Sequence, residues 1–130
     1  MDTDTTTDEK TTADVVINLT TGHEDAEKVL LAFLVATAAQ AKGREVTIFA
    51  TKEAARLGIP GYGEAIEVAG APPVERLMRQ FEEAGGEMLV CPICFDGRRL
   101  DAGRLAPYAQ IGGATPLMDR IGPGTAVFSF

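Results

Sequence analysis

Short apolar runs alternate with helical stretches along most of the chain, and this alternation is the strongest constraint on its fold. The first run, Val15–Leu19, reads V-V-I-N-L and is followed by Thr20, Thr21 and Gly22. A β-branched apolar run of this length is typical of a strand buried on both faces. Strands that alternate with helices imply right-handed crossovers and a parallel sheet. The sequence therefore predicts a single-domain α/β fold with a doubly wound sheet of five mainly parallel strands and helices on both faces.

Local signals place the helices within this pattern. Thr21 and Glu24 have capping-box spacing at the start of a first helix, and Gly43 is a residue type favoured just past a helix end. Pro73 suits the first residue of a later helix, whose apolar residues form one face: Val74, Leu77, Met78 and Phe81. Shorter helical pieces are expected at 52–57 and 115–121. The other strands are expected at 45–50, 87–91, 108–111 and 125–130.

The length and the first residues bound the domain organisation. The 130 residues fit one compact domain with one hydrophobic core. Residues 1–13 are mostly Thr and Asp, so they bury too little apolar surface to offset the entropy of ordering them. We expect a disordered acidic, Thr-rich tail over residues 1–13 and an α/β domain over residues 14–130.

The charge balance excludes some classes of partner. The chain has 12 basic and 19 acidic residues and a formal charge of −7, which disfavours a broad electropositive surface for nucleic acid or anionic lipid. The first residues are acidic and lack the basic and apolar regions of a signal peptide. The longest uncharged stretches, 29–41 and 105–118, are shorter than the roughly 20 residues of a membrane span. We expect a cytoplasmic protein with no membrane span and no nucleic-acid partner.

Two cysteines, Cys91 and Cys94, form one C-P-I-C run at the end of the third expected strand. In parallel sheets, ligands bind at the carboxyl ends of the strands. A helix beginning there would direct backbone N–H groups at the thiol, and Arg98 and Arg99 add positive charge that Asp96 partly offsets. The alternative is that both cysteines are small apolar residues packed under a loop. The position favours reactive thiols in a reducing compartment.

His23 is the only histidine and therefore the only candidate for a histidine general base. It follows the first expected strand, from which it would approach Cys91 across adjacent strands and stabilise the thiolate or move its proton. The alternative is a solvated residue in the first turn of the helix. Cys91, Cys94, His23 and Asp25 also make a mixed set of four metal ligands, but the sequence lacks the second Cys or His pair usual in structural zinc sites.

No cofactor is expected. The loop after the first strand, T-T-G-H-E-D, matches neither G-x-G-x-x-G nor G-x-x-x-x-G-K-[ST]. A partner surface is expected instead on the first helix, which carries no charge from residue 29 to residue 41, although packing on a sheet needs only one apolar stripe. Its far side is predicted to meet another subunit, unless a loop or the neighbouring helix covers it.

Several of these segments resemble the DsrE-like family of small sulfur-relay proteins, of the DsrE, TusD and YchN types. The similar segments are V-V-I-N-L-T-T-G, M-L-V-C-P-I-C-F-D-G-R-R-L, Q-I-G-G-A-T-P-L-M-D-R-I and the final strand. The resemblance spans about residues 14–130. It implies a flavodoxin-like five-stranded sheet, a trimeric or hexameric homo-oligomer, and, in active relay members, a cysteine that carries sulfane sulfur as a persulfide.

By position, the family's active cysteine corresponds to Cys91. Pro92 and Cys94 depart from the single-cysteine pattern of TusD-like members. The leading hypothesis is a persulfide carrier that takes sulfur from a donor protein and passes it to an acceptor. A second thiol three residues on makes a dithiol–disulfide switch the alternative. A non-catalytic oligomeric binding module and a metal-binding domain are the other two hypotheses.

Overall fold

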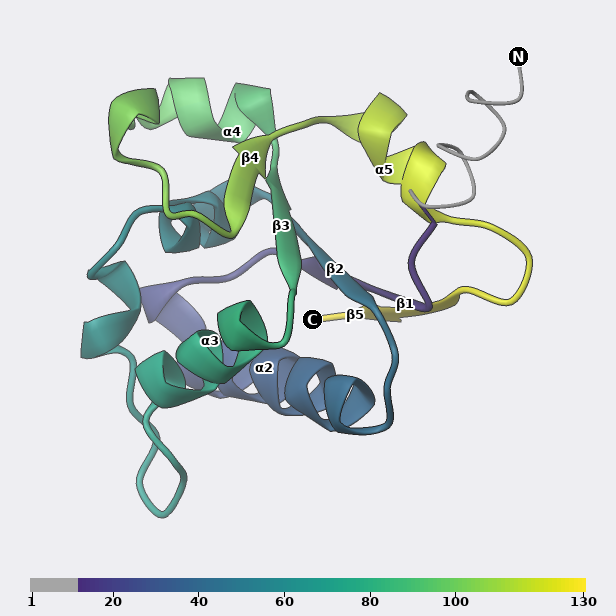
Figure 1. Cartoon of the computed structure of the whole chain (residues 1–130). Helices are drawn as coiled ribbons and strands as arrows, with labels where there is room; N and C mark the ends of the chain where they lie inside the picture. The colour runs from purple at the N-terminus through teal and green to yellow at the C-terminus, as the bar shows by residue number, and fades with distance from the viewer. Residues whose placement is uncertain (1–11) are drawn as a thin grey trace.

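A five-stranded sheet forms the centre of the computed structural model, which describes residues 12–130 (Figure 1). Its strands lie in the order β4-β3-β2-β1-β5, and every neighbouring pair is parallel. The strands are β1 (Val15–Leu19), β2 (Val46–Ala50), β3 (Glu87–Val90), β4 (Ala109–Ile111) and β5 (Ala126–Ser129). The predicted α/β fold with a five-stranded parallel sheet is confirmed. The tail predicted over residues 1–13 lies, as far as residue 11, outside the described residues.

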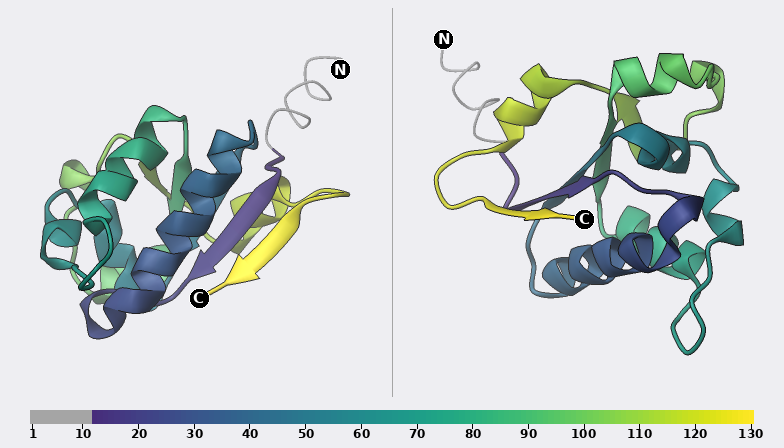
Figure 2. Two further views of the ribbon diagram at one scale, coloured as in Figure 1. Left: turned by 90° about the horizontal axis from the view of Figure 1, so that it is seen from below. Right: turned by 180° about the vertical axis from the view of Figure 1, so that it is seen from behind.

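Helices lie on both faces of this sheet. Figures 1 and 2 show α2 and α3 side by side on one face and α5 on the other. The α-helices are α2 (Ala26–Ala41), α3 (Val74–Glu83), α4 (Pro92–Gly97) and α5 (Ala114–Arg120). Four 3₁₀ turns connect them to the strands: η1 (His23–Asp25), η2 (Lys52–Gly58), η3 (Tyr62–Ala65) and η4 (Ala102–Arg104). Among these described elements, none is long and apolar enough to cross a membrane.

The main hydrophobic core lies between the sheet and the pair α2 and α3. Ile17 of β1 and Ile48 of β2 are completely buried there. Phe33 of α2 meets Phe81 of α3 edge to face, with ring centroids 5.6 Å apart. Full burial of one such side chain contributes about 1.5–3 kcal/mol, so this layer supplies much of the driving force for folding. The apolar face predicted for 74–81 is the buried face of α3.

The first helix begins later than its capping box predicted. Glu24 accepts a hydrogen bond at Oε1 from the backbone N of Gly22, 2.8 Å away, within the 3₁₀ turn η1. Asp25 then caps α2 by accepting from Lys28 N at 3.2 Å. Thr21 Oγ1 is buried and has no hydrogen-bond partner among the described residues. The prediction that Thr21 caps the helix was wrong, because a 3₁₀ turn separates it from the first α-helical turn.

The carboxyl ends of β1, β2 and β3 lie at one edge of the sheet. Because β2 lies between β1 and β3, the segments that follow these three strands come together in the same order. Those segments are residues 20–25, the turn η2 and the helix α4 with its flanks. This edge, which we call the carboxyl edge, carries both cysteines and the histidine.

Candidate functional site

The backbone on both sides of Cys91 is fixed by hydrogen bonds. Its N donates to the carbonyl oxygen of Ala50 at the end of β2, at 3.0 Å, and its carbonyl oxygen accepts from Phe95 N at 2.9 Å. Cys91 is the N-cap residue of α4, with φ −60° and ψ 124°, and Pro92 occupies the first helical position. The side chain of this half-buried residue therefore starts from a rigid junction between β3 and α4.

Cys94 lies within α4, three residues after Cys91. It is half-buried and packs against the hydrophobic core beside the buried ring of Phe95. Both cysteines are free thiols. Cys91 is the N-cap of α4 and Cys94 is the third residue of the helix, so both cysteines lie at the N-terminal end of this short helix. Ile93, between them, is 83% exposed and marks the outer side of α4.

An ion pair joins the end of α4 to the turn after β2. Arg98 donates from Nε to Glu53 Oε2 at 2.6 Å and from Nη1 to the Cys94 carbonyl oxygen at 3.3 Å. Glu53 also accepts at Oε1 from Arg56 Nε at 2.8 Å. The hydrogen bonds from Arg98 and then Arg56 lower the pKa of Glu53 below its ordinary value. One carboxylate thus holds two guanidinium groups in place next to the cysteine-bearing helix.

His23 is held against Tyr62 of η3. The two rings are stacked, with centroids 3.7 Å apart and planes inclined by 12°. His23 N donates to Tyr62 Oη at 2.9 Å, and Nε2 lies 2.8 Å from the Tyr62 carbonyl oxygen. A carbonyl oxygen only accepts, so Nε2 carries a proton and Nδ1 is the acceptor nitrogen of the neutral ring. Burial raises the pKa of Tyr62, which keeps its hydroxyl protonated.

His23 and Cys91 follow strands that are not neighbours. The prediction that His23 approaches Cys91 across adjacent strands was wrong, because β2 lies between β1 and β3. No hydrogen bond within residues 12–130 joins His23 to Cys91 or Cys94. His23 instead lines an open depression of about 690 Å³, together with Glu24, Glu53, Arg56 and Tyr62. Neither cysteine lines this depression.

Two residues of this edge, Glu53 and Tyr62, were not predicted from the sequence. The ion pair that Arg98 forms with Glu53 was not predicted either. The partners in these contacts lie 39 to 45 residues apart in the chain, and no local pattern carries such pairings. Tyr62 also sits between Gly61 and Gly63, a segment that is typical of a flexible loop.

The four residues weighed as metal ligands have other surroundings in the structure. The Asp25 carboxylate caps α2, His23 Nε2 is bonded to Tyr62, and the cysteines lie on α4. Within residues 12–130, no three His, Cys, Asp or Glu side chains are grouped as ligands for a metal ion.

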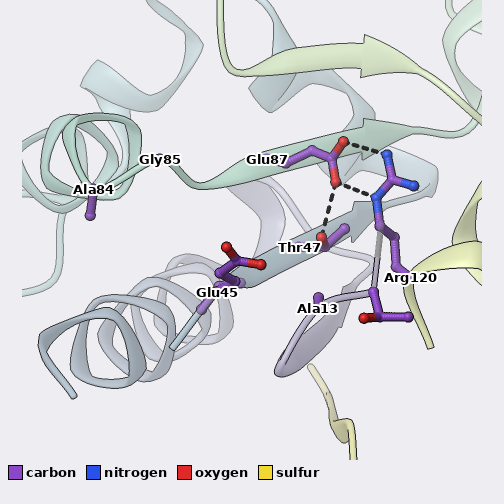
Figure 3. A pocket seen from close by; sticks show the side chains of 9 residues that line it. Ala13, Glu45, Thr47, Ala84, Gly85, Glu87 and Arg120 are labelled. Carbon is purple, nitrogen blue, oxygen red and sulfur yellow. Dashed lines mark hydrogen bonds and ion pairs between the residues drawn. The ribbon is translucent and has the colours of Figure 1, made fainter. Parts of the chain in front are cut away.

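A second cavity, of about 380 Å³, lies at the opposite edge of the sheet (Figure 3). Its main feature is the carboxylate of Glu87, which accepts from Arg120 Nε and Nη2, each at 2.7 Å, and from Thr47 Oγ1 at 3.0 Å. Gln110 Nε2 donates to the same carboxylate at 2.7 Å. The hydrogen bonds with Arg120 lower the pKa of Glu87 and raise that of Arg120. This network fastens the end of α5 to the start of β3.

These features define a class: a small parallel α/β protein with a C-x-x-C pair at the carboxyl edge of its sheet. Residues 13–130 match the DsrE/DsrF-like family, and the chain belongs to that family, as the resemblance predicted. The crystal structure of the ychN protein from E. coli is similar, with a TM-score of 0.72 and 17% sequence identity over 89% of this chain and 97% of that chain. At this identity the likeness concerns the fold alone. No curated protein sequence matches this chain.

Proposed function

We propose that this protein is a sulfur-relay protein in which Cys91 accepts sulfane sulfur, holds it as a persulfide and passes it to an acceptor thiol. The observation that carries the proposal is the position of Cys91, directly after β3 at the carboxyl edge of a DsrE/DsrF-like domain. Ligand sites of parallel sheets occur at this edge.

The proposed reaction is two successive sulfur transfers. The Cys91 thiolate attacks the outer sulfur of a donor persulfide, R–S–SH, so that Cys91–S–SH forms and the donor leaves as R–S⁻. An acceptor thiolate, R′–S⁻, then attacks the same outer sulfur, which gives R′–S–SH and returns the Cys91 thiolate. One S–S bond breaks and one forms in each step, so no external oxidant or reductant is needed.

The residues around Cys91 support this chemistry in distinct ways. The N–H groups of Ile93 and Cys94 lie in the first turn of α4, where an α-helix leaves N–H groups without intrahelical acceptors. They are available to a negatively charged sulfur. The hydrogen bonds to Ala50 and from Phe95 keep the junction rigid while sulfur is exchanged. His23 is proposed to move protons through solvent from Nδ1, because Tyr62 holds its Nε2.

Cys94 supports a second candidate function, a dithiol–disulfide switch. Cys94 lies in the first turn of α4, three residues after Cys91 at the N-cap, and both cysteines are free. Attack of the Cys94 thiolate on the inner sulfur of Cys91–S–SH would form a Cys91–Cys94 disulfide and release HS⁻. If Cys94 does not attack, Cys91 carries the sulfur to an acceptor. If Cys94 attacks, the sulfur is released as HS⁻.

The deciding experiment is intact mass spectrometry of the reduced protein after treatment with a sulfane-sulfur donor. A carrier gains roughly 32 Da, and this gain persists in Cys94→Ser but is absent in Cys91→Ser. A switch loses the mass of two hydrogens instead and gains no sulfur. A wild-type protein that gains no sulfur and forms no disulfide contradicts both candidates and leaves the non-catalytic binding module.

The partners of the relay belong to the same proposal. A donor and an acceptor protein exchange sulfur with Cys91, and the reduced thiols suit the cytoplasm. We also propose self-association, as a trimer or hexamer, through the outer side of α2. On that helix Leu31 is 46% exposed, whereas α3 and the sheet cover the side that carries Phe33. Analytical sedimentation of the wild-type protein and of Leu31→Glu tests this self-association. A monomeric wild-type protein would contradict the proposal.

A further inference from the structure

Lys52 and Arg99 are the only non-glycine residues with positive φ in the described part of the chain, at 54° and 55°. L-residues other than Asn and Asp seldom adopt this left-handed conformation, because Cβ approaches the following carbonyl oxygen. Both residues are exposed and positively charged at neutral pH. At both positions the backbone conformation disfavours a side chain, yet both carry a long cationic side chain.

Glycine would suit the backbone at either position. Arg99 follows the C-cap of α4, and its N donates to the Asp96 carbonyl oxygen at 2.9 Å while Leu100 N donates to that of Phe95 at 3.2 Å. This is the Schellman arrangement, whose left-handed residue is usually Gly. Lys52 is the second residue of a turn closed by Ala54 N and the Thr51 carbonyl oxygen, at 3.0 Å. The local backbone does not account for the choice of Lys and Arg.

Both cations adjoin the same ion pair. Lys52 precedes Glu53 and Arg99 follows Arg98, and Glu53 and Arg98 are bonded to each other at 2.6 Å. No ion pair within residues 12–130 engages Lys52 or Arg99. The negative charge of Glu53 is already paired with two guanidinium groups. The remaining exposed carboxylate on α4 is that of Asp96. The outer surface of α4 and η2 thus has more unpaired positive than negative charge.

The cysteines lie at an open surface. Neither of them lines any of the cavities described above, and Ile93 projects from α4 between them with 83% exposure. An exposed apolar side chain on an element that also presents unpaired charges is an arrangement that suits a protein–protein contact. An enclosed pocket would suit a small sulfur compound better.

We propose that Lys52, Arg99 and Ile93 form a docking surface for an acidic surface on the protein that exchanges sulfur with Cys91. The cations attract the acidic partner and orient it, and Ile93 makes an apolar contact with it. This inference rests on the proposed sulfur transfer and adds the chemistry of the partner.

The test uses two synthetic peptides that differ only in charge. Each contains Leu and one cysteine activated as a mixed disulfide with 2-thiopyridine, flanked in one peptide by Asp and Glu and in the other by Lys. The Cys91 thiolate attacks the peptide sulfur, a Cys91–peptide disulfide forms, and pyridine-2-thiolate leaves with the electron pair. Its absorbance gives the rate, and mass spectrometry of the digested product identifies the modified cysteine.

We expect the acidic peptide to react with Cys91 about tenfold faster than the basic peptide at low ionic strength. This preference should disappear near 1 M salt, where the Debye length is about 3 Å. The Lys52→Asn, Arg99→Asn double variant should lose the preference, because Asn accepts positive φ without the charge. Lys42→Asn, an exposed charge at the C-cap of α2 at the opposite edge, should keep it. Ile93→Ser should slow both peptides.

A structural control separates charge from folding. Lys52→Gly and Arg99→Gly should unfold at the same or a higher temperature than wild type, since Gly adopts positive φ readily. Equal rates for the two peptides, or a preference that survives in the double variant, would each overturn the docking surface. Sulfur loading is measured separately, so a charge preference at a Cys91 that gains no sulfur contradicts only the proposed relay.

Discussion

The Nε of Arg98 lies 2.6 Å from Glu53 Oε2, although the two residues are 45 positions apart in the chain. The same guanidinium donates to the Cys94 carbonyl oxygen. Glu53 therefore connects the turn after β2 to the helix that carries both cysteines. If α4 moved during thiol chemistry, either the ion pair would break or the turn that carries Glu53 would have to move with the helix.

Glu53→Gln tests the energetic weight of that connection. The Glu53 side chain is 35% exposed and that of Arg98 is 26% exposed, so solvent screens the pair and we expect a loss of at most about 1 kcal/mol of unfolding free energy. Urea unfolding at neutral pH measures it. Glu67→Gln, at an exposed position, should change the unfolding free energy by less than about 0.5 kcal/mol. Equal losses in the two variants would contradict the assigned role of Glu53.

In the Glu87→Gln variant, the unfolding free energy should depend less on pH in the acidic range. The pKa of Glu87 is lowered in the fold from its ordinary value of 4.5, chiefly by the hydrogen bonds from Arg120. A carboxyl with a lowered pKa contributes stability above its unfolded pKa, and this contribution is lost as pH falls through the folded pKa. The variant should lose about 1–3 kcal/mol near pH 7.

That difference from wild type should shrink well below pH 4.5, as urea unfolding at both pH values would record. A difference that stays constant over this range would mean that the charge of Glu87 is not what stabilises the fold.

Mild oxidation should produce an intramolecular Cys91–Cys94 disulfide, because both free cysteines lie at the N-terminal end of α4, three residues apart. The protein should lose the mass of two hydrogens and no longer react with an alkylating reagent. Cys94→Ser should retain one alkylatable thiol under the same conditions. Disulfide-linked dimers in place of the intramolecular bond would show that the short helix holds the two sulfur atoms too far apart.

His23→Gln should slow sulfur loading of Cys91 while leaving its final extent unchanged. A proton carrier acting through solvent contributes less than the roughly 10²–10⁴-fold of a general base in direct contact, so we expect about tenfold. Rates come from rapid quenching followed by intact mass. Tyr62→Phe removes the hydroxyl that accepts from His23 N but keeps the aromatic ring, and it should have a smaller effect. An unchanged rate in His23→Gln would remove the histidine from the mechanism.

The strands and the longer helices were predictable because their signals are local. The run V-V-I-N-L is β1 to the residue, and the spacing of Leu77, Met78 and Phe81 gave the buried face of α3. Predicted ends were less accurate: Cys91 was assigned to the third strand, yet it follows β3 as the N-cap of α4. The first helix was placed too early because η1, a 3₁₀ turn, comes before the Asp25 cap.

The site was predictable only in part. The pattern of strands brought the segments after β1 and β3 to one edge, but these two strands were expected to be adjacent, whereas β2 lies between them. The stack of His23 on Tyr62 depends on a contact across 39 residues, and no periodicity in the sequence encodes it. The left-handed backbone conformation at Lys52 could not be predicted from the sequence either, because this conformation is normally adopted by Gly.

Gly22 and Tyr62 depend on each other's size. A methyl group at position 22 would collide with the Tyr62 hydroxyl, which already accepts a hydrogen bond from His23. In an alignment of chains with this architecture, the two columns should therefore co-vary: a tyrosine in the second requires a glycine in the first. Where the tyrosine is replaced by a small residue, the glycine is released from this constraint, and the histidine loses the surface on which it rests.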